Sequence, residues 1–572
     1  MPRSDARRRT LIAAATLPGS VPRARLTVLL ASLNSALLLE TAAIVALLVL
    51  GAAVRLDDFM VVPRLADETL EVVLGLRLSR EGGLPLVGYA PHIGSLFTYL
   101  VAGTFLLLGP KVEAGRLLVL TTGVLTILPT YLLGRELGRS LWGTAGSGRL
   151  VGLIAALLLT LSGPHIATSS RIAYSNSLTP LFTMTGLWLT HRAIARRSNG
   201  ALIGAGAAFG LALQTHVSAL PVFPGVAVAL LLPLAVSTLR DGYAAAWPKL
   251  DTLVTAAWAG LLTIANLVVY NVLVEPGMVR TSGNRIGRYV AESGDASPWA
   301  LDAWGERLGG LLKAVALAIG SQTNELDAPP EALLAPAVLV SVALSLLGLW
   351  VTARRGIWLP LLVTLSVIVT VSAFNARVEP IVPRVRHYVT LVPLAAVLVA
   401  VALGWLHDRA GRWLQGSRQG ARLAWAGTVL VPLLLVGSSL ASYDAYEAER
   451  LSRPDKNNLA YLAVLDAVAQ SGDPNERLYL DYELNDLLTM SGGRMITHLR
   501  YAFSVTGQEF DTMSVANDRL PIGERGDLSR RLILHAETVP RAERMYRLVP
   551  LPGEPGEGAP LRAFRAYPLR PR

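Results

Sequence analysis

Long apolar stretches with almost no charged side chains are the feature that most constrains this chain. Each runs for about 20 residues, the length a helix needs to cross a hydrocarbon core of roughly 30 Å. With 52% hydrophobic and only 16% charged residues, most of the chain must be solvated by lipid. The pattern predicts an all-α polytopic membrane domain of about eleven transmembrane helices over residues 28–441. The expected spans are 28–54, 114–134, 150–167, 177–193, 200–215, 218–237, 251–273, 332–352, 356–374, 386–406 and 422–441.

The arginines predict the orientation of these spans. They gather in alternate short loops, as the positive-inside rule describes for cytoplasmic loops. The net charge of +11 therefore belongs to membrane topology, and we do not expect nucleic acid as a partner. The prediction is an integral protein of the cytoplasmic membrane with a basic cytoplasmic N-terminus, residues 1–27. Its external loops would be 55–113, 274–331 and 375–388.

Residues 93–109 are apolar enough to suggest a further span. Counting them as one would place every downstream arginine cluster on the opposite side. The segment also begins after Pro91-His92 and ends at Gly109-Pro110. We therefore interpret it as a re-entrant or interfacial segment inside the 55–113 loop. The alternative is an ordinary span with a weaker arginine bias elsewhere.

The chain becomes much richer in charged residues from residue 442 onward. A helical pattern followed by alternating strand patterns predicts a soluble α/β domain at 442–572, external because the number of preceding spans is odd. The expected helix is 457–470, and the expected strands are 477–483, 494–503, 531–536, 545–551 and 561–569. We expect this domain to be separable and without catalytic groups. The absence of cysteine excludes disulfides, thiol nucleophiles and thiolate metal sites.

The polar residues that could carry chemistry collect in the predicted external loops. Asp67 and Glu68 form an acidic pair after the first span, where one carboxylate could act as general base on a hydroxyl. The alternative is the acidic first turn of a helix. Arg116 precedes a span on the external side, where a single arginine could also be a snorkelling anchor.

Two further groups of polar residues lie on the same side. A short turn carries Ser169, Ser170, Arg171 and Asn176. The loop 375–388 carries positive charge at the mouth of a span, which suits a phosphate because arginine offers a planar donor fork. Binding of anionic lipid headgroups is the alternative. The candidate residues of this loop are Arg377, Arg384, Arg386, His387 and Tyr388.

Taken in order, these signals resemble the GT-C superfamily of integral-membrane glycosyltransferases. The acidic pair after the first span is followed by Gly109 and then Arg116-Leu117, and the next span ends in Tyr-Leu-Leu-Gly-Arg at 131–135. A Ser-Arg turn follows, and then Arg384, His387-Tyr388 and Pro393. The resemblance is greatest to the protein O-mannosyltransferase and lipid A aminoarabinose transferase group, and it covers roughly residues 28–406. It also implies that Arg116 lies in the first external loop.

The resemblance implies specific roles for these residues. Asp67 would be the catalytic base and Glu68 its neighbour in the acceptor site. Donor phosphate binding would fall to Arg116, Arg384, Arg386 and Tyr388. Further substrate contacts could come from Arg171, Asn176, Arg280, Arg285, Arg288, Tyr289 and His387. Many relatives have an acidic residue where this chain has Asn176, so the use of a divalent cation stays open, and no other cofactor is expected.

The implied reaction is a single inverting displacement. An acceptor hydroxyl on a lipid, glycan or protein would attack the sugar of a polyprenyl-phosphate donor at the non-cytoplasmic face. The rival interpretation is a transporter or lipid flippase, and a third is a membrane scaffold that presents the C-terminal domain. A transporter is expected to carry inverted repeats and charged residues at mid-membrane depth. The predicted spans here are nearly free of charge.

Overall fold

The structure of the chain is a computed structural model. It describes residues 35–62, 68–241, 247–274, 301–322, 335–374, 385–413, 418–454, 456–471, 477–481, 484, 495–513 and 530–569. The chain divides into two units, Met1–Leu47 and Leu48–Arg572. Of the first unit only the beginning of helix α3 (Ser35–Leu56) is described. The helical bundle, the candidate site and the C-terminal sheet all belong to the second.

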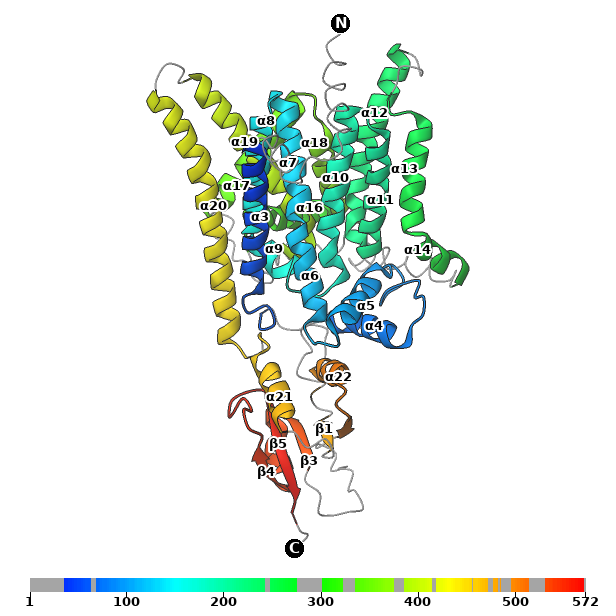
Figure 1. Ribbon diagram of the computed structural model, residues 1–572, viewed down its shortest axis with the longest axis vertical. Helices are drawn as coiled ribbons and strands as arrows, with labels where there is room; N and C mark the ends of the chain where they lie inside the picture. Colours follow the sequence, from blue (N-terminus) through cyan, green and yellow to red (C-terminus); the bar gives the residue numbers. More distant parts are fainter. Residues whose placement is uncertain are drawn as a thin grey trace, which may run out of the picture. The chain divides into compact units, whose positions relative to one another are not determined.

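Helices dominate the part of the second unit that precedes residue 453 (Figure 1). The α-helices after α3 are α4 (Glu68–Glu81), α5 (Leu96–Leu108), α6 (Ala114–Leu125), α7 (Ile127–Trp142), α8 (Ala145–Thr160), α9 (Gly163–Ser169), α10 (Thr179–Arg196), α11 (Asn199–Thr215), α12 (Phe223–Asp241), α13 (Leu250–Thr263), α14 (Ala265–Val269), α16 (Leu301–Ile319), α17 (Pro336–Arg354), α18 (Leu359–Phe374), α19 (Val392–Trp413) and α20 (Arg418–Ser452). Short helical turns connect several of them: η1 (Ser175–Leu178), η2 (Val217–Val222), η4 (Tyr270–Val274) and η6 (Val385–Leu391).

Several of these helices can cross a membrane, as the apolar stretches predict. Within the described residues, six are long and apolar enough: Leu37–Leu56, Ala114–Trp142, Val217–Arg240, Pro336–Arg354, Tyr388–Trp413 and Ala424–Ser452. The number rises to eight if each of two bent pairs is one span, α8 with α9 and α13 with the helix at 265–274. These pairs bend by 60° and 70°. The chain is therefore an integral membrane protein, and the predicted count of eleven spans is not confirmed.

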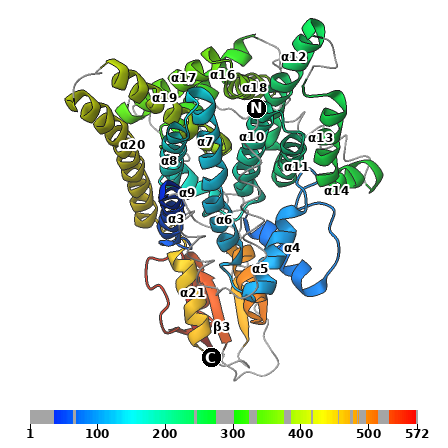
Figure 2. The same ribbon diagram turned by 45° about the horizontal axis from the view of Figure 1, so that its top comes forward.

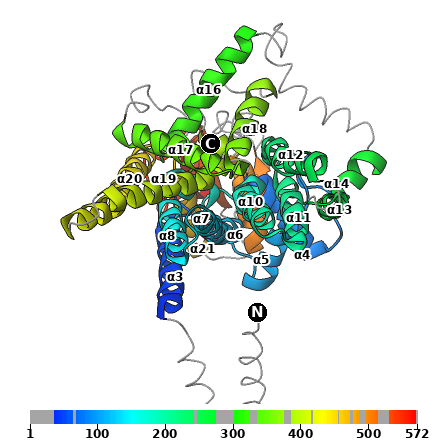
Figure 3. The ribbon, with the colours of Figure 1, turned by 90° about the horizontal axis from the view of Figure 1, so that it is seen from above.

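The centre of the bundle is tightly packed around α7, which contacts α8, α10 and α19. Figure 3 shows these helices end-on, with α20 and α13 toward the outside. Glycine allows α7 and α8 to approach closely: a Cβ atom on Gly138 would lie 2.9 Å from the Cα atom of Gly148. At the turn between the two helices, Thr144 caps α8 by accepting a hydrogen bond from the Ser147 backbone N–H at 3.1 Å.

The loop after the first helix contains two helices, α4 and α5, that pack against each other. A Cβ atom on Gly75 of α4 would lie 2.6 Å from the Cβ atom of Val101 on α5, so glycine is required for this approach. Helix α5 covers most of the segment 93–109 and has 13 residues, about 20 Å of helix. That length is well short of a hydrocarbon core of roughly 30 Å, which supports the interpretation of a re-entrant or interfacial segment.

The C-terminal part of the chain forms a small α/β domain, as predicted. Its strands lie in the order β2-β1-β3-β5-β4; β1 is parallel to both β2 and β3, whereas β5 is antiparallel to both β3 and β4. Figure 2 shows helix α21 across strand β3 of this sheet. The elements are α21 (Leu459–Gln470), β1 (Leu478–Asp481), α22 (Met495–Thr506), β2 (Phe510–Met513), β3 (Arg530–His535), η8 (Ala536–Thr538), α23 (Val539–Ala542), β4 (Tyr546–Pro550) and β5 (Leu561–Pro568).

Three details differ from the sequence expectations. The predicted strand 494–503 is wrong, because residues 495–503 belong to helix α22. Helix α16 lies in the segment 274–331 that we interpreted as a loop, and Leu311 and Leu317 on it are fully buried. Helix α20 continues through the expected domain boundary at 442 and ends at Ser452.

Candidate active site

Helix α4 begins with two buried carboxylates directly after the segment that carries the candidate base. Glu68 and Glu71 lie in its first turn, where the helix dipole favours negative charge. Only 2% of Glu68 and 6% of Glu71 is exposed. Asp67 itself lies outside the described residues, which resume at Glu68.

Glu68 forms a buried, two-pronged ion pair with Arg116. The Arg116 Nη2 lies 2.6 Å from Glu68 Oε1, and the Arg116 Nε lies 3.2 Å from Glu68 Oε2. Both side chains are 2% exposed. The same Glu68 Oε2 accepts a hydrogen bond from the Ala173 backbone N–H at 2.8 Å, and Arg116 Nη1 donates to the Phe59 carbonyl at 2.7 Å. The pair therefore joins the start of α4 to α6 and to two connecting loops.

The predicted Ser-Arg turn lies against this pair. Glu71 Oε2 accepts a hydrogen bond from the Ser175 backbone N–H at 2.8 Å, so both carboxylates of α4 hold the 173–175 backbone. Arg171 is fully buried, and its Nη1 lies 2.9 Å from Glu447 Oε1 on α20. The Arg171 Nη2 also donates to the Asp57 carbonyl. In this arrangement Arg171 ties the end of α3 to α20.

Asn176 lies in the short helical turn η1 that precedes α10. Its Oδ1 accepts hydrogen bonds from Thr179 Oγ1 at 3.1 Å and from Ser218 Oγ at 2.9 Å. Because the amide oxygen binds two hydroxyl groups, Asn176 connects the start of α10 to η2. Within the described ranges, no three His, Cys, Asp or Glu side chains lie close enough together to hold a metal ion.

A fully buried arginine near the site was not anticipated from the sequence. Arg55, near the end of α3, donates from Nε to Ser170 Oγ at 2.9 Å and from Nη1 to the Thr160 carbonyl at 2.8 Å. Its Nη2 lies 3.1 Å from His165 Nδ1 on α9. Arg55 lies in the last turn of an apolar helix, so its sequence position alone did not distinguish it from an interfacial arginine.

The C-terminal domain contacts the segments on both sides of Asp67. The Asn458 backbone N–H donates to the Val61 carbonyl at 3.0 Å, and the Asn458 Nδ2 donates to the Met60 carbonyl at 2.7 Å. On the other side, Thr69 Oγ1 is hydrogen bonded to His498 Nδ1 of α22. The Tyr461 hydroxyl donates to the His498 carbonyl at 3.2 Å. These contacts join the C-terminal domain to the described residues before and after Asp67, and the separability of the domain stays a prediction.

Helix α22 also shares a hydrophobic core with the first loop. Tyr501 and Val505 pack in one cluster with Val72 of α4, Phe97 of α5 and Val119 of α6. The Tyr501 hydroxyl donates to the Val112 carbonyl at 3.4 Å. Burial raises the pKa of the Tyr461 and Tyr501 hydroxyls well above their ordinary value. Both groups therefore stay protonated donors at physiological pH.

The donor-site residues expected in the 375–388 loop are only partly described. Tyr388 is 7% exposed and lies on η6, which contacts α9, α10, α16 and α19. The turn is thus brought beside α9, the helix that leads into Arg171. Arg384 lies outside the described residues, as do Arg377, Arg280, Arg285, Arg288 and Tyr289. For Arg386 and His387 the structure describes the backbone alone.

Because α22 contacts α4, we expect the C-terminal domain to stabilise the candidate site. Tyr501→Ala should remove a buried aromatic ring, which typically costs about 3–5 kcal/mol, and should lower both the apparent Tm and the catalytic activity. Tyr567→Ala, on strand β5 of the same domain, is the matched control and should preserve activity. Thermal unfolding and turnover of the purified variants measure both effects. Equal activity of the two folded variants would contradict a supporting role for α22.

Comparison with known proteins agrees with this architecture. Residues 94–259 match the sequence family described as dolichyl-phosphate-mannose-protein mannosyltransferase. A search of curated proteins found no significant match. The crystal structure of ArnT from Cupriavidus metallidurans bound to undecaprenyl phosphate has a TM-score of 0.53 at 12% identity, covering 93% of this chain and 98% of that chain. Its apo state has a TM-score of 0.50 at 12% identity, covering 91% and 97%. The sequence match and the shared fold together confirm the predicted resemblance of this chain to the GT-C integral-membrane glycosyltransferases.

Proposed function

We propose that this protein transfers a sugar from a polyprenyl-phosphate donor to an acceptor hydroxyl on the non-cytoplasmic side of the membrane. The observation that carries the proposal is the buried Glu68–Arg116 pair. It anchors Glu68, the first residue of α4 and the next residue after Asp67 in the sequence, in a chain that has the ArnT fold. The undecaprenyl phosphate in the related ArnT structure supports a lipid phosphate as the leaving group.

In the proposed mechanism, Asp67 removes the proton of the acceptor hydroxyl as its oxygen attacks the anomeric carbon. The bond between that carbon and the phosphate oxygen breaks, and polyprenyl phosphate leaves with the electron pair. Arg384 and Arg386 stabilise the negative charge that develops on the phosphate. One displacement inverts the anomeric configuration. The transition state resembles an oxocarbenium ion, as in glycoside hydrolysis, so a carboxylate is a sufficient base.

We infer that Glu68 and Arg116 position the site and do not react themselves. Both Glu68 oxygens accept hydrogen bonds from Arg116, and one also accepts from Ala173. Because these donors occupy both carboxylate oxygens, Glu68 has little room left to contact a substrate hydroxyl. We therefore assign the base to Asp67 and the anchoring of its segment to Glu68. The sequence had left both carboxylates as catalytic candidates and had placed Arg116 with the donor phosphate.

Substrate discrimination tests the proposed function. Purified protein is incubated with labelled sugars linked either to polyprenyl phosphate or to a nucleotide, together with candidate acceptors, and products are followed by mass spectrometry. We expect transfer from the lipid-linked donors alone, with release of polyprenyl phosphate. Movement of intact labelled lipid across reconstituted vesicles without cleavage would instead identify a flippase.

The proposed orientation of the membrane domain makes a separate prediction. Val112 and Met60 contact the C-terminal domain, which supports placing these segments and that domain on one side of the membrane. Reporter fusions at Lys111 and Gly507 should both read as exported. A fusion at Gly143, the left-handed residue that ends α7, should read as cytoplasmic. A cytoplasmic signal at Lys111 would make 93–109 a membrane span and refute the external placement of Arg116.

A further inference from the structure

A cavity rich in arginine lies between α17 and α19, far from the candidate active site. It has a volume of about 270 Å³ and is lined by Trp350, Val351, Arg354, Arg355, Trp405, Arg409 and Arg412. Four of these seven residues are arginines and none is acidic. Arginine side chains gathered in this way repel one another unless an anion lies between them.

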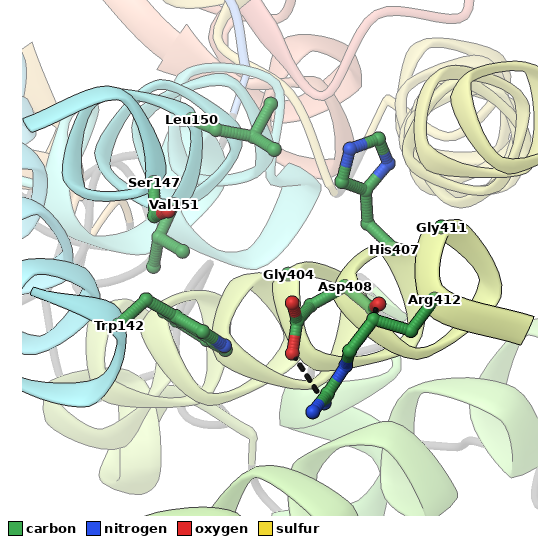
Figure 4. A pocket seen from close by; sticks show the side chains of 9 residues that line it. All are labelled: Trp142, Ser147, Leu150, Val151, Gly404, His407, Asp408, Gly411 and Arg412. Carbon is green, nitrogen blue, oxygen red and sulfur yellow. Dashed lines mark hydrogen bonds and ion pairs between the residues drawn. The ribbon is translucent and has the colours of Figure 1, made fainter. Parts of the chain in front are cut away.

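The position of this cavity separates it from Glu68 and Arg116. Arg116 lies at the beginning of the continuous helix Ala114–Trp142, whose 29 residues span about 40 Å. Trp142, at the other end, lines a second cavity of about 240 Å³ that shares Arg412 with the first (Figure 4). The two cavities therefore lie at the end of the bundle opposite the candidate active site.

Two tryptophans hold arginines of the cavity in place. Trp350 of α17 and Trp405 of α19 pack edge to face, with ring centroids 5.7 Å apart. The Arg354 guanidinium lies 5.0 Å from the Trp350 ring centroid, and that of Arg409 lies 5.5 Å from the Trp405 ring centroid. Cation–π contact fixes the plane of each guanidinium without neutralising it. Arg355 is held by a 3.3 Å hydrogen bond from its Nη1 to the Leu141 carbonyl.

Neighbouring negative charge does not balance these arginines. Arg412 pairs with Asp408 at 2.6 Å, as Figure 4 shows, but among the described residues Arg354 and Arg409 form no salt bridge. The C-terminal ends of α17 and α19 each contribute a partial charge of about −0.5. After Asp408 and the two helix ends are counted, about two positive charges remain, which suits one phosphate group.

We propose that this cavity binds the phosphate headgroup of an anionic phospholipid. The arginine forks match phosphate oxygens, and the tryptophans place the cavity at the membrane surface, where such headgroups lie. The same two helices carry exposed apolar side chains, Leu346 on α17 and Leu406 on α19, that would contact acyl chains. Basic pockets between transmembrane helices are suited to anionic headgroups. The proposal is independent of the proposed glycosyl transfer.

Lipid retention tests this site. Purified protein is equilibrated with an equimolar mixture of phosphatidylglycerol and phosphatidylcholine, and retained lipids are counted by native mass spectrometry. We expect Arg354→Gln/Arg409→Gln to retain at most about one tenth of the phosphatidylglycerol that wild type retains. The amount of retained phosphatidylcholine should not change. Arg197→Gln, an exposed arginine outside the cavity, is the matched control and should behave as wild type. Equal phosphatidylglycerol retention by the double variant and wild type would overturn the proposal.

Two further arms distinguish a specific lipid site from diffuse electrostatic attraction and from a site for free anions. Arg354→Lys/Arg409→Lys keeps the charge but loses the planar forks, so we expect it to retain clearly less phosphatidylglycerol than wild type. Wild-type retention by this lysine variant would mean diffuse attraction and would refute a specific site.

We expect inorganic phosphate to displace phosphatidylglycerol poorly, because it lacks acyl chains. Ready displacement at low phosphate concentration would identify a free-anion site and overturn the proposal.

Discussion

Glu68→Ala should destabilise the protein strongly, by about 3–5 kcal/mol, the usual cost of breaking a buried ion pair. The substitution leaves the Arg116 guanidinium, 2% exposed, without its carboxylate partner. It also removes the acceptor for the Ala173 N–H. A lower apparent Tm of the detergent-solubilised protein and a shorter half-life of its activity are the measured effects. Glu81→Ala, at the exposed end of the same helix, is the matched control and should leave both unchanged.

A double substitution distinguishes the loss of the ion pair from the cost of leaving one buried charge without a partner. Glu68→Gln/Arg116→Met removes both charges and fills similar volume, so no buried charge is left unpaired. We expect this double variant to be more stable than Glu68→Ala, because replacing a buried pair by neutral groups is often close to neutral. Its activity should still be impaired, since the start of α4 loses an anchor. A wild-type Tm for Glu68→Ala would contradict the buried pair.

The general architecture of the membrane domain followed from the sequence because lipid imposes a simple rule. A spanning helix must be apolar over its whole length, and α3, α17 and α20 contain runs that satisfy this requirement. The count was harder to predict. Helix α11 has 17 residues, and α8 bends by 60° into α9. Hydropathy alone does not distinguish such short or bent helices from complete spans.

The misassigned strand has a physical origin. Residues 495–503 have apolar side chains spaced closely enough to suggest alternation, but they bury two faces of helix α22. Leu499 and Phe503 pack in the core of the C-terminal domain, whereas Tyr501 packs with the first loop. A helix that is buried on two sides loses the simple period of 3.6. The four-residue strand β2 was missed because its edge position leaves Asp511 and Thr512 exposed.

The sequence singled out several residues of the candidate site, but it did not indicate which of them contact one another. Glu68 and Arg116 were singled out for different reasons, one as part of an acidic pair and one as an arginine outside the basic loops. Their pairing joins positions separated by 48 residues, which no local pattern encodes. The hydrogen bond between Thr69 and His498 spans 429 residues. Such contacts depend on tertiary packing, and the sequence provided no signal for them.

Asp67→Asn should reduce turnover by about 100-fold or more, the usual contribution of a general base. Asparagine keeps the shape and the hydrogen-bonding capacity of aspartate but cannot accept the proton of the acceptor. The affinity for the donor should change little, because its phosphate is assigned to the arginines. Steady-state turnover and equilibrium binding of a labelled polyprenyl-phosphate sugar check the two statements separately.

Substitution of the donor-site arginines should give the opposite pattern. Arg384→Ala and Arg386→Ala each remove a charge-assisted hydrogen bond to phosphate, so donor affinity and rate should fall together. Each such bond typically contributes about 1.5–3 kcal/mol, which corresponds to about 10- to 150-fold in affinity. Unchanged donor affinity in both variants would exclude these arginines from the donor site.

The most direct measurement is a single-turnover experiment on Asp67. Labelled polyprenyl-phosphate sugar is bound first, the acceptor is added, and the formation of glycosylated acceptor is timed for wild type and Asp67→Asn by rapid quenching. The experiment isolates bond formation from donor binding and product release. We expect equal amounts of bound donor in the two proteins and a product-forming step at least about 100-fold slower in Asp67→Asn. Product formation at the wild-type rate by folded Asp67→Asn would contradict the assignment of Asp67 as the catalytic base.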